Sequence, residues 1–255
     1  MLPISRSGPT KLRRREQPSI PIGAWSPYAI NPVAWYDASN AASITSSGGL
    51  VSQWDDISGS GRHLAQATSS LQPTTGTTTQ NGRNVIVFDG TRVLKNSTSI
   101  IDSDYTLISV FKVVTPGSSF VMPSVTLNSG NAGRPIERWQ HPDFGNRIYF
   151  NDDGSFVVSN VDLRNWTTWK VWSYTYSKTT TVNPRLVEYE NNVVKTTTNS
   201  SSPHVVTSQK ICVGQRDDAV TTFNGHVAEI IIVPYIIPDG NRIQLHNYLA
   251  AKWGL

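Results

Sequence analysis

Residues 51–67 read VSQWDDISGSGRHLAQA, a strand-like run that ends in a tryptophan and two acids and is followed by a turn of serine and glycine. A large aromatic side chain at a strand end can close a hydrophobic core, and an aspartate readily accepts hydrogen bonds from the next turn. Glycine gives such a turn its backbone freedom, here at Gly59 and Gly61. We therefore expect Trp54 in the core and Asp55 or Asp56 bonded to the turn. A metal or sugar loop is the alternative interpretation.

The whole chain has the composition of an all-β protein. Its 255 residues include eight Trp and nine Tyr, are rich in Ser and Thr, and contain no long run of strong helix formers. From residue 31 onward, short apolar runs alternate with turn residues, as in a β-sandwich. The expected strands are 33–37, 50–54, 84–89, 105–114, 119–127, 146–150, 155–159, 169–177, 185–190, 210–214 and 226–233. Hairpin turns are expected at 151–154 (NDDG) and around Asn191 and Asn192.

One helix is expected, at the end of the chain, where residues 238–255 read PDGNRIQLHNYLAAKWGL. Asp239 is suited to cap its first turn, and Gly254 is suited to end it. The apolar residues between them recur at helical spacing, which predicts one face packed on the sandwich. That face consists of Leu245, Tyr248, Leu249 and Trp253.

The first 30 residues differ from the rest of the chain. Five prolines interrupt them, which disfavours both a helix and a place inside a sheet. Residues 1–20 carry the whole formal net charge of +4, so the remaining body is neutral. We expect an extended arm over residues 1–30 and one domain over 31–255. The arm is expected to bind an acidic, partly apolar partner surface through Arg13, Arg14, Arg15, Ile20, Ile22 and Trp25.

The lone cysteine, Cys212, cannot form an internal disulfide and is expected to be a small buried strand residue. The N-terminus has no apolar core like that of a secretory signal. The apolar runs are far shorter than the ~18 residues that a membrane helix needs. These features favour a protein made in a reducing cytoplasm, without a signal peptide or a membrane partner.

A resemblance to a known family rests on six segments in order: 32–45 (PVAWYDASNAASIT), 51–67, 72–74 (QPT), 85–90 (VIVFDG), 223–233 (FNGHVAEIIIV) and 248–255 (YLAAKWGL). Together they resemble the concanavalin A-like, laminin-G-like domains found in many phage virion proteins and bacterial surface proteins. The middle of the chain matches poorly. The resemblance implies a jelly-roll sandwich of two antiparallel sheets. Because this scaffold carries lectins, glycoside hydrolases and purely structural domains, the function depends on the site.

An enzyme on this scaffold is expected to carry the laminarinase-type pattern E-x-D-x-x-E, which places two acids on one strand face. None of the five glutamates begins that pattern. Glu188 and Glu190 share one strand face, and we interpret them as a solvated strand edge. Glu229 is interpreted as a strand acid paired with an arginine or a backbone donor. We therefore expect no enzymatic activity.

Two kinds of ligand site are candidates. Aromatic side chains and a histidine in the middle of the chain are suited to stack on a sugar: Trp139, His141, Tyr149 and Trp166. We assign Trp169, Trp172 and Tyr174 to the core instead. No cofactor is expected, and Ca²⁺ is the alternative, because two acid pairs lie on predicted loops: Asp152 with Asp153, and Asp217 with Asp218.

The preferred function is a non-enzymatic structural or adhesive virion protein of a bacteriophage, in a capsid decoration or a tail. The arm is expected to attach it to other virion proteins, the domain to form a homo-oligomer, and a host surface glycan to be a partner. Nucleic acid is the weaker partner because the body is neutral. A free carbohydrate-binding lectin is the first alternative, and a glycoside hydrolase with unrecognised acids is the second.

Overall fold

The computed structural model describes residues 25–98, 104–114, 124–127, 138–140, 148–152, 155–159, 167–177, 186–198, 209–215 and 223–255. Between residues 124 and 159 the description is limited to backbone pairing. Arg13, Arg14, Arg15, Ile20 and Ile22 lie outside the described residues, so their role stays a prediction.

Strands make up most of the described chain. They are β1 (Ala34–Asp37), β2 (Ile44–Ser47), β3 (Leu50–Trp54), β4 (Leu64–Ala65), β5 (Thr79–Gln80), β6 (Arg83–Asn84), β7 (Ile86–Asp89), β8 (Leu94–Lys95), β9 (Tyr105–Val113), β10 (Ser124–Leu127), β11 (Arg138–Gln140), β12 (Ile148–Asp152), β13 (Ser155–Ser159), β14 (Lys170–Tyr176), β15 (Leu186–Glu190), β16 (Val193–Thr198), β17 (Gln209–Val213) and β18 (Asn224–Val233). The helical elements are the 3-10 turns η1 (Pro27–Ile30), η2 (Ala41–Ser43) and η3 (Ser69–Leu71), and the α-helix α1 (Asp239–Trp253).

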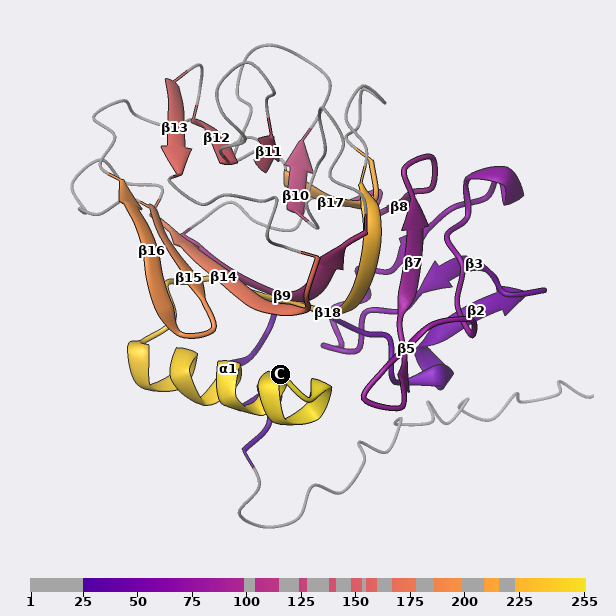
Figure 1. Ribbon diagram of the computed structural model, residues 1–255, viewed down its shortest axis with the longest axis horizontal. Helices are drawn as coiled ribbons and strands as arrows, with labels where there is room; N and C mark the ends of the chain where they lie inside the picture. Colours follow the sequence, from indigo (N-terminus) through magenta and orange to yellow (C-terminus); the bar gives the residue numbers. More distant parts are fainter. Residues whose placement is uncertain are drawn as a thin grey trace, which may run out of the picture.

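Two antiparallel sheets form the sandwich (Figure 1). Within the described ranges, the first sheet has the order β1-β18-β9-β14-β15-β16, with β7 also paired to β18, and the second has the order β10-β17-β8-β4-β3-β2. A smaller sheet, β11-β12-β13, and the pair β5-β6 complete the strands that the structure describes. The predicted all-β sandwich of two antiparallel sheets with a C-terminal helix is confirmed.

The main core fills the space between the two sheets. Alternating residues of each strand point inward and bring together large aromatic and branched side chains, such as Tyr36, Phe111, Trp172 and Ile230. Trp54, at the end of β3, is 0% exposed, and its ring centroid lies 5.7 Å from that of Tyr36. The prediction that Trp54 closes the core is confirmed.

Asp56 holds the turn after Trp54. It is one of the two aspartates that the sequence analysis predicted for this role. The Asp56 carboxylate accepts hydrogen bonds from the backbone N–H groups of Ser58 at 2.9 Å and Arg62 at 3.0 Å. It also accepts one from the Trp35 N–H at 2.9 Å, which fixes the turn to β1. Gly59 and Gly61 have φ of 95° and 71°, values that favour glycine. The turn is thus built as the structural interpretation expects.

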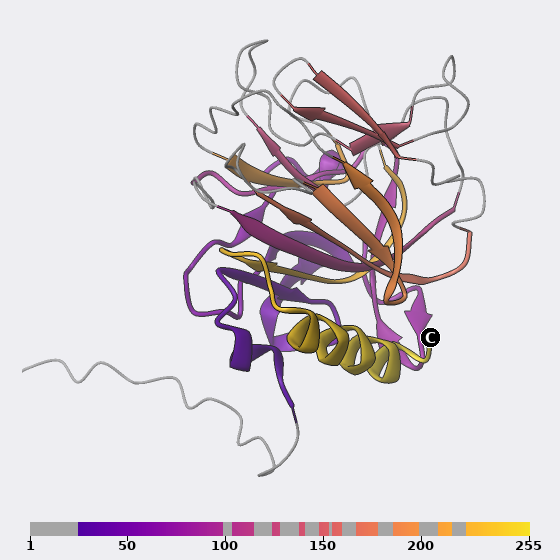
Figure 2. The ribbon, with the colours of Figure 1, turned by 90° about the vertical axis from the view of Figure 1, so that its left-hand side faces the viewer.

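A second core lies between the first sheet and α1, which covers the sheet face turned away from the second sheet (Figures 1 and 2). Leu245, Leu249 and Trp253 of the predicted stripe are buried, and Tyr248 is partly buried. The helix ends at Gly254, whose φ of 68° is left-handed and whose N–H donates to the Ala250 carbonyl.

The helix begins differently from the sequence expectation. Pro238 holds the capping position, and Asp239 is already helical, so the predicted Asp239 cap is wrong. Because Asp239 lies in the first turn, its carboxylate accepts a hydrogen bond from Arg242 Nε at 3.1 Å instead. Arg242 is itself buried, and its guanidinium stacks 3.8 Å from the centre of the Tyr189 ring.

The N-terminal segment that the structure describes packs against the domain. The Trp25 ring lies 5.9 Å from that of Tyr248 on α1, and Ile30 is buried in the second core. The Ile30 carbonyl accepts a hydrogen bond of 2.8 Å from the Tyr235 hydroxyl. Residues 25–30, which the sequence analysis assigned to the arm, therefore contact the sandwich, and Trp25 faces the domain's own helix.

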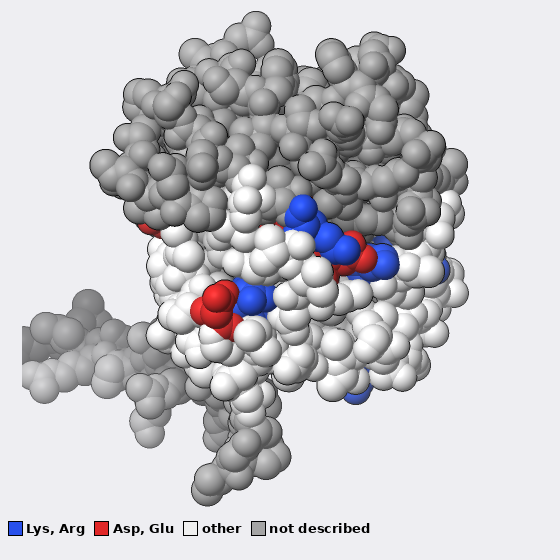
Figure 3. All heavy atoms as spheres, turned by 60° about the vertical axis from the view of Figure 1, so that its left-hand side comes forward, with Lys and Arg blue, Asp and Glu red and all other residues white. Residues whose placement is uncertain are grey.

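Among the described residues, no helix is both long and apolar enough to cross a membrane. On the face shown in Figure 3, the described positive and negative side chains lie next to one another in small groups. The described part of this face carries no broad region of a single charge, in line with the neutral body expected from the sequence.

Candidate functional site

The sequence-predicted glycan residues fall in the least described part of the chain. Trp139 on β11 and Tyr149 on β12 are direct cross-strand partners, so the structure brings two of the four together. His141 and Trp166 lie outside the described residues. Glycan contact by these side chains stays a prediction.

The predicted calcium ligands are also mostly outside the description. Asp152 is the last residue of β12, whereas Asp153, Asp217 and Asp218 lie outside the described residues. Within the part of the chain that the structure covers, no three His, Cys, Asp or Glu side chains gather as they would around a metal ion. Calcium at the predicted acid pairs stays a prediction.

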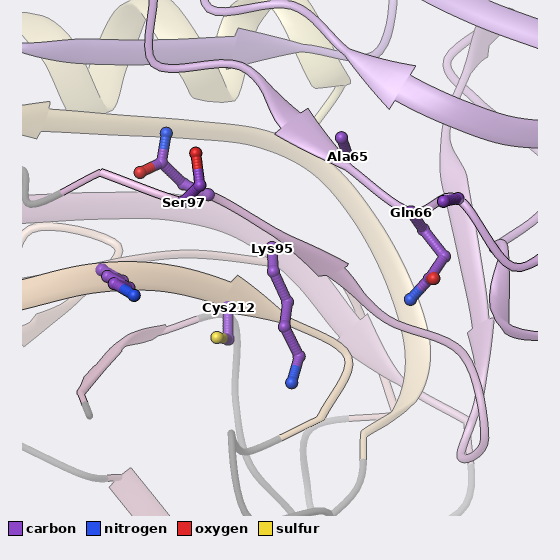
Figure 4. A pocket seen from close by; sticks show the side chains of 8 residues that line it. Ala65, Gln66, Lys95, Ser97 and Cys212 are labelled. Carbon is purple, nitrogen blue, oxygen red and sulfur yellow. The ribbon is translucent and has the colours of Figure 1, made fainter. Parts of the chain in front are cut away.

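A pocket lies on the second sheet, on the side opposite the core (Figure 4). Residues 65–67 and 95–97 line it together with Lys210 and Cys212, and its volume is about 390 Å³. Small-molecule sites have volumes of about 300 to 1,000 Å³, so the pocket has room for a ligand of sugar size.

Strand alternation explains which side chains line the pocket. Leu64, Leu94 and Ile211 point into the core, so the residues that follow them along β4, β8 and β17 point outward. Lys95 is the cross-strand partner of both Ala65 and Cys212, which places the three side by side. Cys212, predicted to be a buried strand residue, is 2% exposed.

Two amide side chains brace the pocket instead of facing a ligand. Asn96 Oδ1 accepts hydrogen bonds from the Thr98 N–H at 2.8 Å and from its hydroxyl at 3.1 Å, and Asn96 Nδ2 donates to the His63 carbonyl at 3.3 Å. Gln66 Oε1 accepts from the Thr68 N–H at 3.0 Å, and Gln66 Nε2 donates to the Val93 carbonyl at 3.4 Å. These bonds hold the turns after β4 and β8, which form the pocket rim.

Gly214, directly after β17, lies against the segment that leads into β8. Its φ is 98°, and a Cβ built there would lie 2.2 Å from the Arg92 carbonyl oxygen and 2.4 Å from the Phe88 ring. Only glycine fits this approach, because any side chain would push β17 away from the segment that leads into β8. Gly214 therefore allows the end of β17 to lie close to the segment that leads into β8.

Polar and charged groups line the pocket. Lys95 and Lys210 contribute ammonium groups, Ser97 a hydroxyl group and Cys212 a thiol. Among the described residues that line it, there is no carboxylate. The described lining thus offers hydrogen-bonding groups for an oxygen-rich ligand, but no acid-base pair for hydrolysis.

Sequence reasoning missed this pocket. Its lining residues come from three segments that are about 30 and more than 100 positions apart, and the strands β4 and β8 are only two residues long. The signal in the sequence was the alternation of large apolar residues with small or polar ones in residues 64–65 (LA), 94–95 (LK) and 210–213 (KICV). That signal predicts which side chains face outward, but not which strands become neighbours.

The interpretation of Glu188 and Glu190 as a solvated edge is wrong. β15 is not an edge strand, because β16 pairs with it on the outside, and Glu188 is 0% exposed. Glu190 forms ion pairs with Lys170 at 2.8 Å and Lys195 at 3.3 Å. Partial burial pushes the pKa of Glu190 upward, but the hydrogen bonds and charges of the two lysines outweigh this and hold it below its usual value.

Glu229 is the centre of a buried polar cluster between the first sheet and α1. Its carboxylate accepts hydrogen bonds from Trp35 Nε1 at 2.8 Å, Lys252 Nζ at 2.7 Å and Trp253 Nε1 at 2.8 Å. Lys252 Nζ also donates to Asp37 Oδ2 at 2.7 Å. The sequence analysis expected an arginine or a backbone donor, and the structure supplies a lysine and two indoles.

Burial raises the pKa of Glu229 to about 7, and the charge of Asp37 adds to the rise while Lys252 and Trp253 oppose it. Burial tends to lower the pKa of Lys252, but the two carboxylates outweigh it and raise the pKa above its usual value. Since Glu229 is 1% exposed, a substrate cannot reach its carboxylate. We assign this cluster to holding α1 on the sheet.

A serine and a histidine also meet in the interior, but not as a nucleophilic pair. His246 Nε2 lies 2.7 Å from Ser173 Oγ, and His246 Nδ1 accepts a hydrogen bond from the Asn192 N–H at 3.2 Å. Burial, followed by the charge of Arg242, lowers the pKa of His246 to about 3. The proton of the neutral ring therefore sits on Nε2, so this nitrogen cannot take the serine proton as a general base.

No protein-family model matches this sequence, and no curated protein is significantly similar to it. Solved structures with the same architecture do exist. An arabinofuranosidase complexed with arabinofuranosyl-α-1,2-xylobiose is similar with a TM-score of 0.61 and 12% identity, over 84% of this chain and 62% of that one. A sialidase of Trypanosoma rangeli in complex with sialic acid gives a TM-score of 0.60 at 10% identity, over 92% of this chain and 35% of the sialidase.

Domain 4 of an extracellular arabinanase from Geobacillus stearothermophilus, in complex with arabinotriose, has nearly the same extent as this chain. Its TM-score is 0.57 at 12% identity, over 84% of this chain and 98% of that one. At these identities the similarity shows the fold alone, a β-sandwich. In the arabinofuranosidase and the sialidase, the chain spans less than two thirds of the length of the protein it matches.

The comparisons correct the expectation of no enzymatic activity. That expectation rested on the missing laminarinase-type pattern of acids. The similar structures include a sialidase, an arabinofuranosidase and an arabinanase domain. The missing pattern therefore does not separate this chain from proteins that cleave sugars, and the sequence argument against an enzyme fails.

Proposed function

We propose that this protein binds carbohydrate through the pocket formed by β4, β8 and β17. The observation that carries the proposal is the pocket itself, which is of sugar size and is lined by ammonium, hydroxyl and thiol groups. Sugars are recognised by such hydrogen-bonding groups placed on a rigid scaffold, and here the strand pairing and the bonds of Gln66 and Asn96 supply the rigidity. The presence of arabinotriose on the arabinanase domain supports a sugar ligand on a sandwich of this extent.

Ala65→Trp tests the pocket directly. Ala65 is exposed on the pocket side of β4, so an indole there should fill the space without disturbing the core. We expect the wild type to bind at least one member of a panel of oligosaccharides that includes arabinotriose, and Ala65→Trp to lose at least about tenfold in affinity. Isothermal titration calorimetry measures the affinities of both proteins.

The matched control is Ala251→Trp, which adds the same side chain at an exposed position of α1. It should bind as the wild type does. Equal binding by Ala65→Trp and the wild type would remove the pocket from the proposal, and a wild type that binds no oligosaccharide would refute carbohydrate binding.

Glycoside hydrolysis is the second candidate, favoured by Glu188 and Glu190 on one face of β15. Their cross-strand partners on β14 are Tyr174 and Trp172, so the pair lies beside aromatic residues. It is the weaker candidate because Glu188 has no exposed surface and a catalytic acid must touch its substrate. Reducing-sugar release from arabinan that disappears in Glu188→Gln, with binding retained, would decide for it.

We propose further that the basic segment before Trp25 attaches the domain to a larger assembly, such as a phage particle. Residues 1–20 hold the whole net charge, and the charged groups in Figure 3 are locally balanced. Arginine side chains can pair with carboxylates of a partner through two parallel hydrogen bonds. Attachment to other virion proteins, a homo-oligomeric state and a host glycan as target all belong to this proposal.

Two deletions separate attachment from folding. Removing residues 1–24 should leave a cooperative thermal transition at the wild-type temperature, because Trp25 and Ile30 keep their contacts. Removing residues 1–30 should lower the transition, since the second core loses both side chains. Co-sedimentation with the particle should fail for both. Normal assembly of the 25–255 protein would contradict the attachment proposal.

A further inference from the structure

We infer that the protein has a second sugar-binding surface, on the first sheet, where Trp169, His226 and Lys112 lie in one row across three strands. This row, called the Trp169 row below, is separate from the pocket on β4, β8 and β17, which belongs to the other sheet. Its ligand is an oligosaccharide, one ring of which stacks on the indole while its oxygens bond to the imidazole and the ammonium group. The inference goes beyond the proposed pocket and does not depend on it.

Strand register builds the row. Lys112 of β9 is the cross-strand partner of His226 of β18. On the other side of β9, β14 begins at Lys170, opposite Phe111. The next position therefore places Trp169 opposite Lys112. The backbones of the three residues span two strand spacings, about 10 Å, so the row is wide enough for more than one contact with a sugar chain.

The three side chains also meet one another. The ring centroids of Trp169 and His226 lie 6.2 Å apart, with the ring planes at 49°. Lys112 Nζ lies 5.6 Å from the centre of the Trp169 ring. All three residues are partly exposed. An aromatic ring, an imidazole and an ammonium group are thus within reach of one ligand.

The row faces outward, at the margin of the second core. Phe111, the neighbour of Lys112 on β9, points into the main core, so Lys112 points to the opposite face. Two positions further along, Val110 and Val171 lie on that outward face and are buried in the second core. Trp169, which the sequence analysis assigned to the core, packs against this second core and is only partly buried. The row is therefore where the outward face of the sheet meets solvent.

His226 supplies a neutral hydrogen-bonding ring. Burial, followed by the charge of Lys112, lowers the pKa of His226 to about 4, so the ring carries no charge at pH 7. Its Nδ1 is buried without a hydrogen-bond partner among the described residues. A proton on Nδ1 would be a buried, unpaired donor, so the proton belongs on Nε2. Nε2 then donates to solvent or to an oxygen of a ligand.

Lys112 supplies a charged donor that is not engaged in an ion pair. Within the described ranges, its contacts are with the Trp169 ring and the neighbouring imidazole. Three other lysines of the first sheet and α1 each pair with a glutamate: Lys170, Lys195 and Lys252. The ammonium group of Lys112 is therefore available to an oxygen of a ligand.

The combination of groups favours a sugar over an apolar protein surface. A sugar ring has a face of C–H groups, which suits an aromatic side chain, and a rim of hydroxyl groups, which suits donors beside it. An apolar partner would cover the ammonium group of Lys112 without pairing it, which is costly. We therefore assign the row to an oligosaccharide.

The test starts from the Ala65→Trp protein, because its pocket on β4 is filled and remaining binding comes from elsewhere. Arabinotriose, xylotriose and trigalacturonic acid are titrated separately while the indole N–H signals are followed by NMR, and the Trp169 signal is identified by its absence in Trp169→Phe. We expect at least one trisaccharide to shift the Trp169 signal to saturation. Trp169→Ala in the same background should weaken that binding at least about tenfold in calorimetry.

Trp25→Ala is the matched control for Trp169→Ala. It also removes a partly buried tryptophan that packs against the second core, but at α1 and away from the row. It should bind the trisaccharide as its parent does. If Trp25→Ala and Trp169→Ala weaken binding equally, loosening of the second core is the cause, and the inference is overturned.

Lys112→Gln should weaken binding by about threefold to tenfold, because glutamine replaces a charged donor by a neutral one. Lys195→Gln is the matched control. It removes the same charge from β16 of the same sheet, where Lys195 pairs with Glu190 and lies outside the row. Its affinity should equal that of its parent. Binding that Lys112→Gln abolishes and Trp169→Ala leaves unchanged would overturn the sugar assignment, because it would indicate a simple anion site.

The remaining outcomes separate the row from the pocket. If none of the three trisaccharides shifts the Trp169 signal in a protein that melts as the wild type does, the second surface is refuted, whatever the pocket binds. If the wild type and Ala65→Trp bind equally and both lose binding with Trp169→Ala, the pocket is refuted and the row is supported.

Discussion

Lys252→Met should lower the free energy of unfolding by about 3 to 5 kcal/mol, the usual cost of removing one partner from a buried ion pair. In the wild type, Lys252 Nζ bonds to both Asp37 and Glu229 at 2.7 Å, and it alone supplies positive charge to this cluster among the described residues. Methionine fills a similar volume, so the loss of stability comes from the missing charge and not from a cavity. Urea unfolding, monitored by tryptophan fluorescence, measures the free energy of unfolding.

The pH dependence gives this prediction a second readout. The folded-state pKa of Glu229 is raised to about 7, above its usual value of 4.5, so its contribution to stability is present below the usual pKa and is lost as the pH rises through about 7. Without Lys252 the ionised carboxylate loses its main partner. The loss in Lys252→Met should therefore be larger at about pH 8 than at about pH 5.

Lys195→Gln is again the control, because its ion pair with Glu190 is partly exposed and should be worth less than about 1 kcal/mol. A loss in Lys252→Met no larger than this, or one that does not change with pH, would contradict the assignment of the Glu229 cluster to holding α1.

The fold could be predicted from the sequence wherever the signal is local. β3 and β13 have the expected bounds, because alternating residues and flanking turns mark them within a few positions. Asn191 and Asn192 have φ of 48° and 68°, as the expected hairpin requires. α1 follows from the spacing of its apolar residues, and only its first residue was assigned a wrong role.

The candidate site could not be predicted because it depends on strand order. Ala65, Lys95 and Cys212 become neighbours only when β4, β8 and β17 pair, and nothing near each residue indicates its partner. The same holds for Asp37 and Lys252, which are 215 positions apart in sequence and 2.7 Å apart in space.

The burial of individual acidic residues also could not be predicted from the sequence. Glu188 was placed on a solvated edge, but the returning strand β16 pairs with β15 on the outside and becomes the edge instead. Alternation predicts that Glu188 and Glu190 share a face. It does not say which face, and the structure places Glu188 opposite Tyr174 of the main core.

Trp54→Ala should destabilise the domain by about 3 to 5 kcal/mol, as expected when a large aromatic side chain is removed from a core. Trp54 is 0% exposed, and β3 pairs at this position with Ile44 of β2 and Leu64 of β4. The cavity would open beside the Tyr36 ring, where the second sheet meets the first. Thermal and urea unfolding should both show the loss.

Trp54→Phe separates packing from polarity at the same position. The indole N–H of Trp54 is buried without a hydrogen-bond partner among the described residues, so phenylalanine removes an unpaired donor while keeping most of the apolar volume. We expect a clearly smaller loss of stability than in Trp54→Ala.

Because Leu64 directly precedes Ala65, loosening β4 in Trp54→Ala should also weaken oligosaccharide binding in proportion to the lost stability. A variant that melts like the wild type but no longer binds sugar would instead show that residues 51–67 form a ligand loop.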